Sequence, residues 1–181
     1  MSKLSSRQHH RGQSLAEMAV VIPVLFLLLM GGFDASVMIA DKITAGYAVR
    51  QGARLAAEIG GSQTNQSSTT AQVDQQIVRN VLAVARGLTS AQPTEIDIYT
   101  PSRADGSYTA GDPVDQFFIS SGGGVSPGIQ TFPIQNRSQT PPGETSIGVR
   151  ILWRYSPPAG IFPSNMQIAD YAVMKAAPLL V

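Results

Sequence analysis

The first long apolar run of the chain covers residues 15–33, and no charged residue occurs between 18 and 33. About 20 apolar residues span the hydrocarbon core of a bilayer, so this run predicts a membrane-crossing helix. Pro23 lies inside it, where proline removes one backbone donor and crowds the preceding turn. Pro23 therefore predicts a kink in the helix, although membrane helices also tolerate proline without a functional reason.

The helical pattern continues beyond Asp34. Small residues recur there at intervals of three and four, which lets another backbone or a sheet approach closely; they are Ala45, Ala48, Gly52, Ala53 and Ala56. An unbroken helix over residues 15–58 would be about 66 Å long, whereas a bilayer core is about 30 Å thick. We therefore expect residues 13–40 to cross the membrane and residues 41–60 to continue the helix into an exported domain.

Residues 61–181 predict a small α+β domain. The stretch 60–71 is rich in Gly, Ser, Thr, Gln and Asn and indicates a loop, and residues 73–88 return to the helical period. Residues 122–143, rich in Gly, Pro, Ser and Gln, indicate a second, long loop. The helix and the loops therefore leave the rest of this domain for an antiparallel sheet.

Alternating apolar and polar residues predict the strands of that sheet. The clearest is 145–155, with five apolar side chains on one face: Ile147, Val149, Ile151, Trp153 and Tyr155. Residues 94–100 predict a strand whose Glu95 and Asp97 lie on a solvent-exposed face, and 117–120 indicate a further short strand. Residues 167–175 fit either a helix or a strand, and we favour a strand that returns to the same sheet.

The charge distribution orients the predicted membrane helix. Lys3, Arg7 and Arg11 precede Gly12 without any acid, whereas ten basic and twelve acidic side chains follow it. The positive-inside rule places the N-terminus in the cytoplasm and the C-terminal domain outside. A cleaved secretory signal also has a basic start, but its apolar core is usually shorter and a small-residue cleavage site follows it. The charge balance gives no support for nucleic-acid binding.

Gly12 stands directly before the sequence Gln13-Ser-Leu-Ala-Glu17. A carboxylate one turn inside a membrane helix costs about 2.5–3.5 kcal/mol on insertion scales. Gly12, Glu17 and the apolar helix together resemble the processing site of type IV pilin-like proteins. The resemblance implies that a prepilin peptidase cuts between Gly12 and Gln13, so that residues 1–12 are a leader.

Three blocks resemble TadE-like pseudopilins of the tight-adherence (Flp) pilus system. Residues 11–17 with 20–25 look like the N-terminal signature, 48–57 resemble the second block, and 166–178 are similar to the closing segment. The resemblance implies a minor pilin or pseudopilin in the inner membrane. Its implied partners are the prepilin peptidase, other pilins or pseudopilins and the pilus assembly platform. Residues 60–144 match no block of the family, and entry into the fibre stays open.

The resemblance also implies an assembly role for Glu17. Cleavage creates a positive amine on Gln13, and a buried carboxylate is tolerable when it is paired. The amine of a neighbouring subunit is the partner that a pilin-like assembly supplies. In the alternative interpretation, Glu17 only extends to water at the cytoplasmic interface.

The composition argues against an enzyme. The chain has no Cys, and its only histidines, His9 and His10, lie in the predicted leader, so the common general bases and thiol nucleophiles are absent from the exported part. We expect no cofactor. Asp105, Asp112 and Asp115 carry oxygens of the kind that bind calcium, but their spacing favours a solvated turn. The alternatives to a pseudopilin are a signal-anchored extracytoplasmic binding or adhesion domain, which would keep its leader, and an assembly scaffold.

Overall fold

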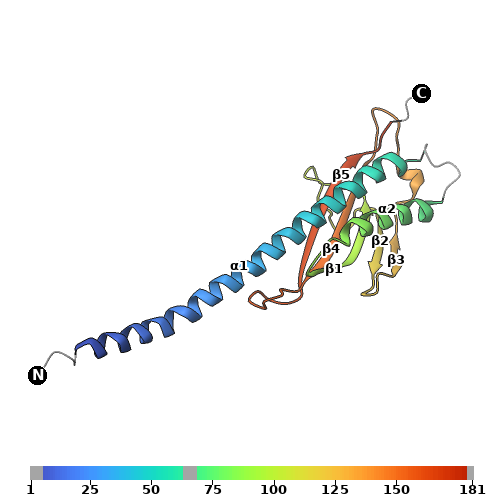
Figure 1. The fold of residues 1–181 in the computed structure, drawn as a ribbon. Coiled ribbons are helices and arrows are strands. Elements are labelled where there is room, and N and C mark those ends of the chain that lie inside the picture. The colour runs from blue at the N-terminus through green and yellow to red at the C-terminus, as the bar shows by residue number, and fades with distance from the viewer. Residues whose placement is uncertain (1–5, 63–68, 179–181) are drawn as a thin grey trace, which may run out of the picture.

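The structure is a computed structural model that describes residues 6–62 and 69–178, with side chains from Gln13 onward. One long helix, α1 (Ser6–Ile59), leads into a small sheet domain. The first half of α1 extends away from this domain, and its second half packs along the sheet (Figure 1). The α+β class with a long N-terminal helix and an antiparallel sheet is therefore confirmed.

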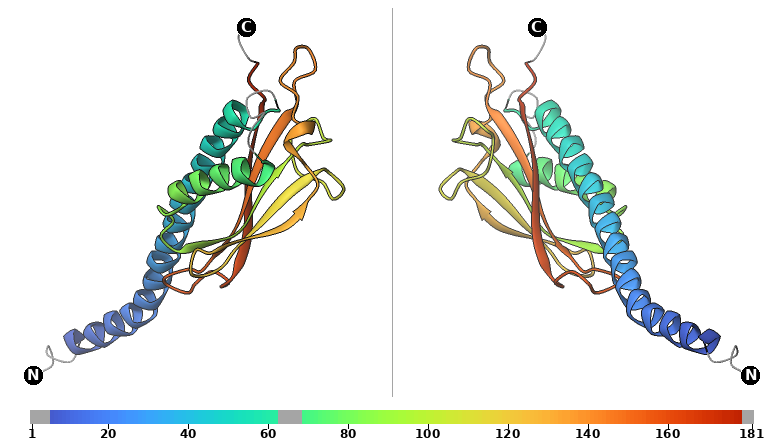
Figure 2. Two further views of the ribbon diagram at one scale, coloured as in Figure 1. Left: turned by 90° about the vertical axis from the view of Figure 1, so that its right-hand side faces the viewer. Right: turned by 90° about the vertical axis from the view of Figure 1, so that its left-hand side faces the viewer.

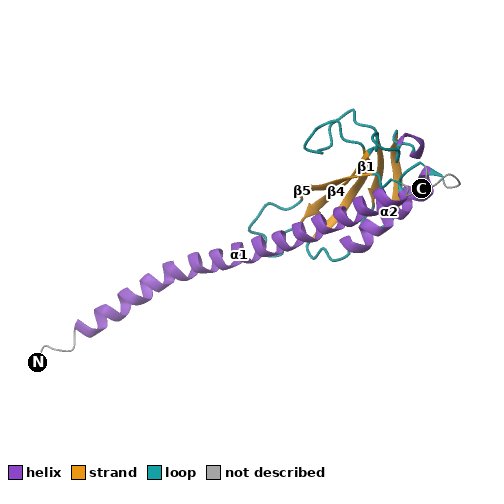
Figure 3. Ribbon diagram, turned by 90° about the horizontal axis from the view of Figure 1, so that it is seen from above, coloured by secondary structure: helices purple, strands orange, loops and turns teal. Residues whose placement is uncertain are grey.

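The sheet has five antiparallel strands in the order β3-β2-β1-β4-β5. Their bounds are β1 Ala91–Tyr99, β2 Val114–Ile119, β3 Val125–Gln130, β4 Ser146–Tyr155 and β5 Met166–Lys175. The strand interpretation of residues 167–175 is correct, because β5 pairs with β4 along its whole length. Helix α1 and the shorter helix α2 (Thr70–Ala85) lie on the same side of the sheet (Figures 2 and 3).

Helix α2 begins three residues before the predicted start. Its cap is Thr69, whose hydroxyl accepts from the N–H of Gln72, while the Gln72 side chain accepts from the N–H of Thr69. This reciprocal capping box satisfies two donors that a helix start otherwise leaves unpaired. Within the predicted loop before α2, residues 63–68 lie outside the described part of the chain.

The core lies between the two helices and the sheet. All five apolar residues predicted on one face of β4 are fully buried there, as are Ile96 and Ile98 of β1. The small-residue stripe of α1 is also buried. A Cβ placed on Gly52 would lie 2.3 Å from Cγ2 of Val81 in α2, so glycine is required for this close approach. The stripe thus works as predicted, by letting α1 pack closely on the rest of the domain.

The structure corrects two expectations. The predicted long loop over 122–143 contains strand β3 and the short 3-10 helix η1 (Ile134–Asn136). The expected solvent-exposed face of β1 is covered, because Asp97 is fully buried beneath Arg150 and the loop that follows β1. In that loop the ring of Tyr108 stacks under the Arg150 guanidinium at 4.1 Å, and the hydroxyl of Tyr99 donates to Gly106 O at 2.7 Å.

Candidate functional site

The outer surface of α1 is the first candidate functional surface. Its N-terminal half forms the one described helix that is long and apolar enough to cross a membrane, and none of its most apolar window is buried in the protein. Over residues 15–33, exposed apolar side chains lie on all sides of the helix. This segment fits a single-pass membrane anchor with a C-terminal domain.

The predicted processing and assembly residues lie in the first turns of α1. Gly12 is inside the helix, and the side chain of Gln13 donates to Oε1 of Glu17 at 3.1 Å, with both side chains exposed. The helix runs without interruption through Pro23. The structure is that of a single subunit, so the pairing of Glu17 with the amine of a neighbouring subunit stays a prediction. The cleavage after Gly12 and the kink at Pro23 also stay predictions.

Asp34 ties α1 to the C-terminal domain where the uncharged run ends. Its carboxylate is buried and accepts from the N–H of Ala159 at 2.7 Å and from that of Ile161 at 2.9 Å. Its carbonyl accepts from the hydroxyl of Tyr155 at 2.8 Å. All three partners belong to the end of β4 and the β4–β5 loop, so Asp34 holds that loop against the helix.

Asp41 makes the same kind of contact one heptad later. Its two carboxylate oxygens accept from the N–H groups of Thr89 and Ser90, at 2.7 and 2.9 Å, in the turn between α2 and β1. Residues seven apart lie on one face of a helix, and that face continues into the small-residue stripe. Sequence reasoning treated Asp34 as an interruption of the apolar run. The available signal was the seven-residue spacing of two acids on the face that packs inward.

The opposite face of this part of α1 is uncovered. Ile39, Ile43 and Tyr47 recur at four-residue intervals and are 56%, 69% and 55% exposed. Beside them, Lys42 Nζ lies 3.3 Å from Oδ1 of Asp170 in β5, whose Oδ2 accepts from Nε1 of Trp153. A cavity of about 290 Å³ opens between this ion pair and the apolar stripe. This stripe continues the exposed apolar surface of the membrane segment beyond residue 33.

A buried ion cluster joins α2 to the sheet. The Arg137 guanidinium donates to both oxygens of Asp74 at 2.6 and 3.0 Å, to Asp115 Oδ2 at 3.0 Å and to Phe132 O at 2.7 Å. All three charged side chains are buried, and burial raises the pKa of Asp74 to about 7 against the opposing effect of Arg137. This cluster is structural, because its hydrogen bonds connect elements of the core.

The calcium hypothesis receives no support from the placement of its three carboxylates. Asp105 accepts from the N–H and the hydroxyl of Ser107, and Asp112 accepts from the N–H of Thr109. Asp115 belongs to the Arg137 cluster and Asp112 is also buried, so the expectation of a solvated turn is wrong for these two residues. Among the side chains of residues 13–62 and 69–178, no group of three or more His, Cys, Asp or Glu could hold a metal ion.

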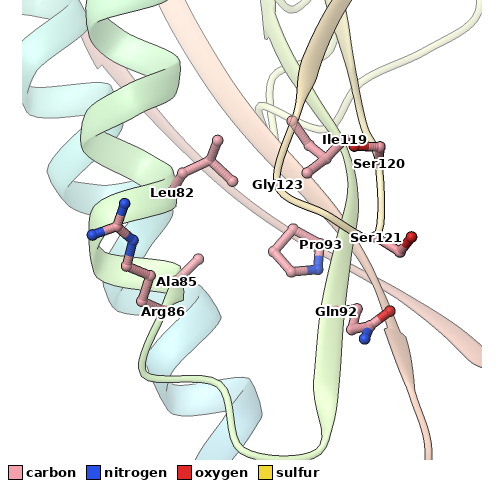
Figure 4. Close-up of a pocket in the computed structure, with 9 residues that line it drawn as sticks. All are labelled: Leu82, Ala85, Arg86, Gln92, Pro93, Ile119, Ser120, Ser121 and Gly123. Carbon is pink, nitrogen blue, oxygen red and sulfur yellow. The ribbon is translucent and has the colours of Figure 1, made fainter.

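Two cavities lie between α2 and the strands. The one in Figure 4 has a volume of about 200 Å³, and Arg86 is the only charged residue in its lining. It is bounded by Leu82 and Ala85 of α2, by Pro93 of β1 and by the β2–β3 turn. The other, of about 520 Å³, extends under β3 beside Phe117 and Arg79. Neither lining contains a carboxylate or a histidine, the side chains that most often act as general acids or bases.

The comparison with known protein families agrees with the N-terminal resemblance. Residues 12–54 match the model of the family described as TadE-like protein. No curated protein and no solved structure matches the chain. The matched segment contains Gly12, Glu17, the apolar run, Asp34 and Asp41, and it ends within the small-residue stripe. The family suggests a protein associated with tight-adherence pili.

Proposed function

We propose that this TadE-like chain is a minor pilin or pseudopilin that takes part in building or anchoring a tight-adherence (Flp) pilus. A prepilin peptidase would cut it between Gly12 and Gln13, and α1 would then hold it in the inner membrane with the C-terminal domain outside. The observation that carries the proposal is that the family match begins at Gly12 and follows α1 alone. The role expected of this family is therefore associated with the helix.

The exposed surface of α1 supports a role in assembly. Its apolar membrane segment is followed by the stripe of Ile39, Ile43 and Tyr47, which the C-terminal domain leaves uncovered. A helix packed on one face by its own domain and apolar on the other can bind the helix of another subunit. Other pilins, pseudopilins or the assembly platform are the partners that we propose for this face.

Processing is tested by the intact mass of the protein from cells that contain the cognate prepilin peptidase. We expect the chain to lose its first twelve residues, and Gly12→Ala to block that loss. Gly32→Ala is the matched control, because a Cβ at Gly32 meets no atom within 4 Å. An unprocessed wild-type chain would contradict the proposal and favour an anchored domain that keeps its leader.

The role of Glu17 is tested separately from processing. If Glu17 pairs with the new amine of a neighbouring subunit, Glu17→Gln should be cut and membrane-bound but should fail to support piliation. Removing one partner of a buried pair costs about 3–5 kcal/mol. Glu58→Gln is the control, because Glu58 is exposed on the same helix and pairs with Arg54 at 3.0 Å. Normal piliation by a correctly cleaved Glu17→Gln protein would leave Glu17 as an interface residue only.

A further inference from the structure

The β4–β5 loop, residues 156–165, lies beside α1 at the end of the membrane segment (Figure 2). Asp34 fixes the loop by accepting from the N–H groups of Ala159 and Ile161. A Cβ placed on Gly31 would lie 3.7 Å from Cγ2 of Ile161. Gly31 belongs to the uncharged run, so Ile161 lies beside a residue of the membrane segment itself.

The chemistry of this loop suits a partly dehydrated environment. Residues 156–165 carry no charge and include three prolines, which have no N–H donor. The N–H groups of Ser156, Ala159 and Ile161 are already hydrogen-bonded within the protein. Ile161 nevertheless remains 44% exposed. The loop therefore presents an exposed apolar side chain, and hydrogen bonds within the protein already satisfy three of its seven backbone donors, which lowers the cost of leaving water.

The side chains around the loop form a surface suited to contact with lipid. They do not form an acidic surface of the kind that would bind a basic partner protein. Arg154 and Arg86 are exposed at this end of the domain, and residues 86–93 and 154–165 contain no acid. The two carboxylates that do reach these loops, Asp34 and Asp41, are buried and accept backbone N–H groups. Exposed basic residues beside an apolar tip are the combination that binds phosphate headgroups and the acyl boundary of a membrane.

We propose that the β4–β5 loop is a second membrane contact, in which Ile161 and the neighbouring prolines enter the headgroup region of the bilayer that α1 crosses. Asp34 sets the depth of this contact, because it joins the loop to the helix where the uncharged run ends, within the last turns of the predicted span 13–40. The C-terminal domain is then held at the bilayer surface at two points instead of turning about a single helix. This inference rests on α1 crossing the membrane and is independent of a role in a pilus.

The test uses the full chain in vesicles, with an environment-sensitive fluorophore attached to one introduced cysteine. The chain has no native Cys, so Ile161→Cys, Leu28→Cys and Ala110→Cys each give one site. Leu28 lies in the membrane segment, and Ala110 is exposed in the loop between β1 and β2. Nitroxide-bearing lipids should quench the label at positions 28 and 161 but not at 110. Aqueous iodide should quench it most strongly at 110.

A further variant tests the role of Asp34. Asp34→Ala in the Ile161→Cys protein should reduce lipid quenching at 161, whereas Ser36→Ala, an exposed change nearby, should leave it unaltered. The fluorescence of Trp153, the only tryptophan and fully buried, reports whether each variant is folded. Strong quenching at 28 with only iodide quenching at 161 in a folded protein would overturn the proposal. Absence of lipid quenching at 28 would overturn both this contact and the membrane anchor.

Discussion

Replacing Arg137 by methionine should strongly destabilise the C-terminal domain. The guanidinium makes four hydrogen bonds, three to the carboxylates of Asp74 and Asp115 and one to a backbone carbonyl, and it lies over the ring of Phe132. Methionine fills similar space but leaves two buried carboxylates without their cation. Breaking a buried ion pair on one side costs about 3–5 kcal/mol. Folded domains are stable by only about 5–15 kcal/mol, so much of the stability would be lost.

The assay is urea unfolding of the full chain in detergent micelles, followed by the fluorescence of Trp153. This side chain is fully buried in β4 and donates to Asp170, so its emission changes when the sheet opens. With a urea slope of about 2 kcal/mol per molar, a loss of about 4 kcal/mol lowers the midpoint by about 2 M. Arg79→Met is the control, because Arg79 is exposed on α2 and surface changes usually stay within about 0.5 kcal/mol.

Two results would refute this reasoning. One is an Arg137→Met midpoint that agrees with that of Arg79→Met, which would mean that the cluster contributes little. The other concerns the variant in which Arg137, Asp74 and Asp115 are all replaced by apolar residues of similar volume. Whole buried ion clusters can be replaced in this way at little cost, so this variant should recover part of the lost stability. A triple variant that is less stable than Arg137→Met would contradict an electrostatic origin of the loss.

Two further predictions concern the same domain. Burial raises the pKa of Asp74 to about 7 in the folded state, so the folded state binds this proton more tightly than the unfolded state does. The free energy of unfolding should therefore fall as pH rises from about 4 to about 7. Asp74→Asn should flatten that slope in urea titrations, and the slope left over is assigned to Asp97, whose pKa burial also raises to about 7. Gly52→Ala should lower the thermal unfolding midpoint, because its Cβ would lie 2.3 Å from Val81 Cγ2 and overpacking costs about 1–3 kcal/mol. Gly46→Ala, with nothing within 4 Å of its Cβ, should raise it, and equal shifts of both variants would contradict the close-packing argument.

The elements that could be predicted from the sequence are those whose pattern is strictly periodic. The alternating residues of β4 and the helical period of α2 appear in the structure close to their predicted bounds. The small-residue stripe of α1 was also sufficient to predict a close contact, because its spacing fits only one face of a helix. In each case the local pattern and the tertiary packing favour the same conformation.

Strand β3 could not be predicted in the same way. Its sequence, Val-Ser-Pro-Gly-Ile-Gln, lacks alternation and contains both Pro127 and Gly128. Proline is tolerated because β3 is an edge strand that pairs only with β2. A Cβ on Gly128 would lie 2.6 Å from the ring of Phe118 in β2, so the glycine makes room for a cross-strand aromatic side chain. The strand depends on its neighbour, which no local pattern records.

The acids show most clearly why the candidate site was only partly predictable. Asp74 and Asp115 reach Arg137 across 63 and 22 residues of sequence, and such partners cannot be chosen from a single chain without knowledge of the fold. Asp34 and Asp41 differ, because their seven-residue spacing on the inward face of α1 was visible. Their partners are backbone N–H groups in the loops before β1 and after β4. Among the described residues, no neighbouring strand accepts these N–H groups, so the carboxylates do. A carboxylate on a long helix can accept such donors, whereas an apolar side chain cannot. An acid repeated at heptad spacing beside a membrane segment can therefore indicate where a helix leaves the bilayer and begins to carry a domain.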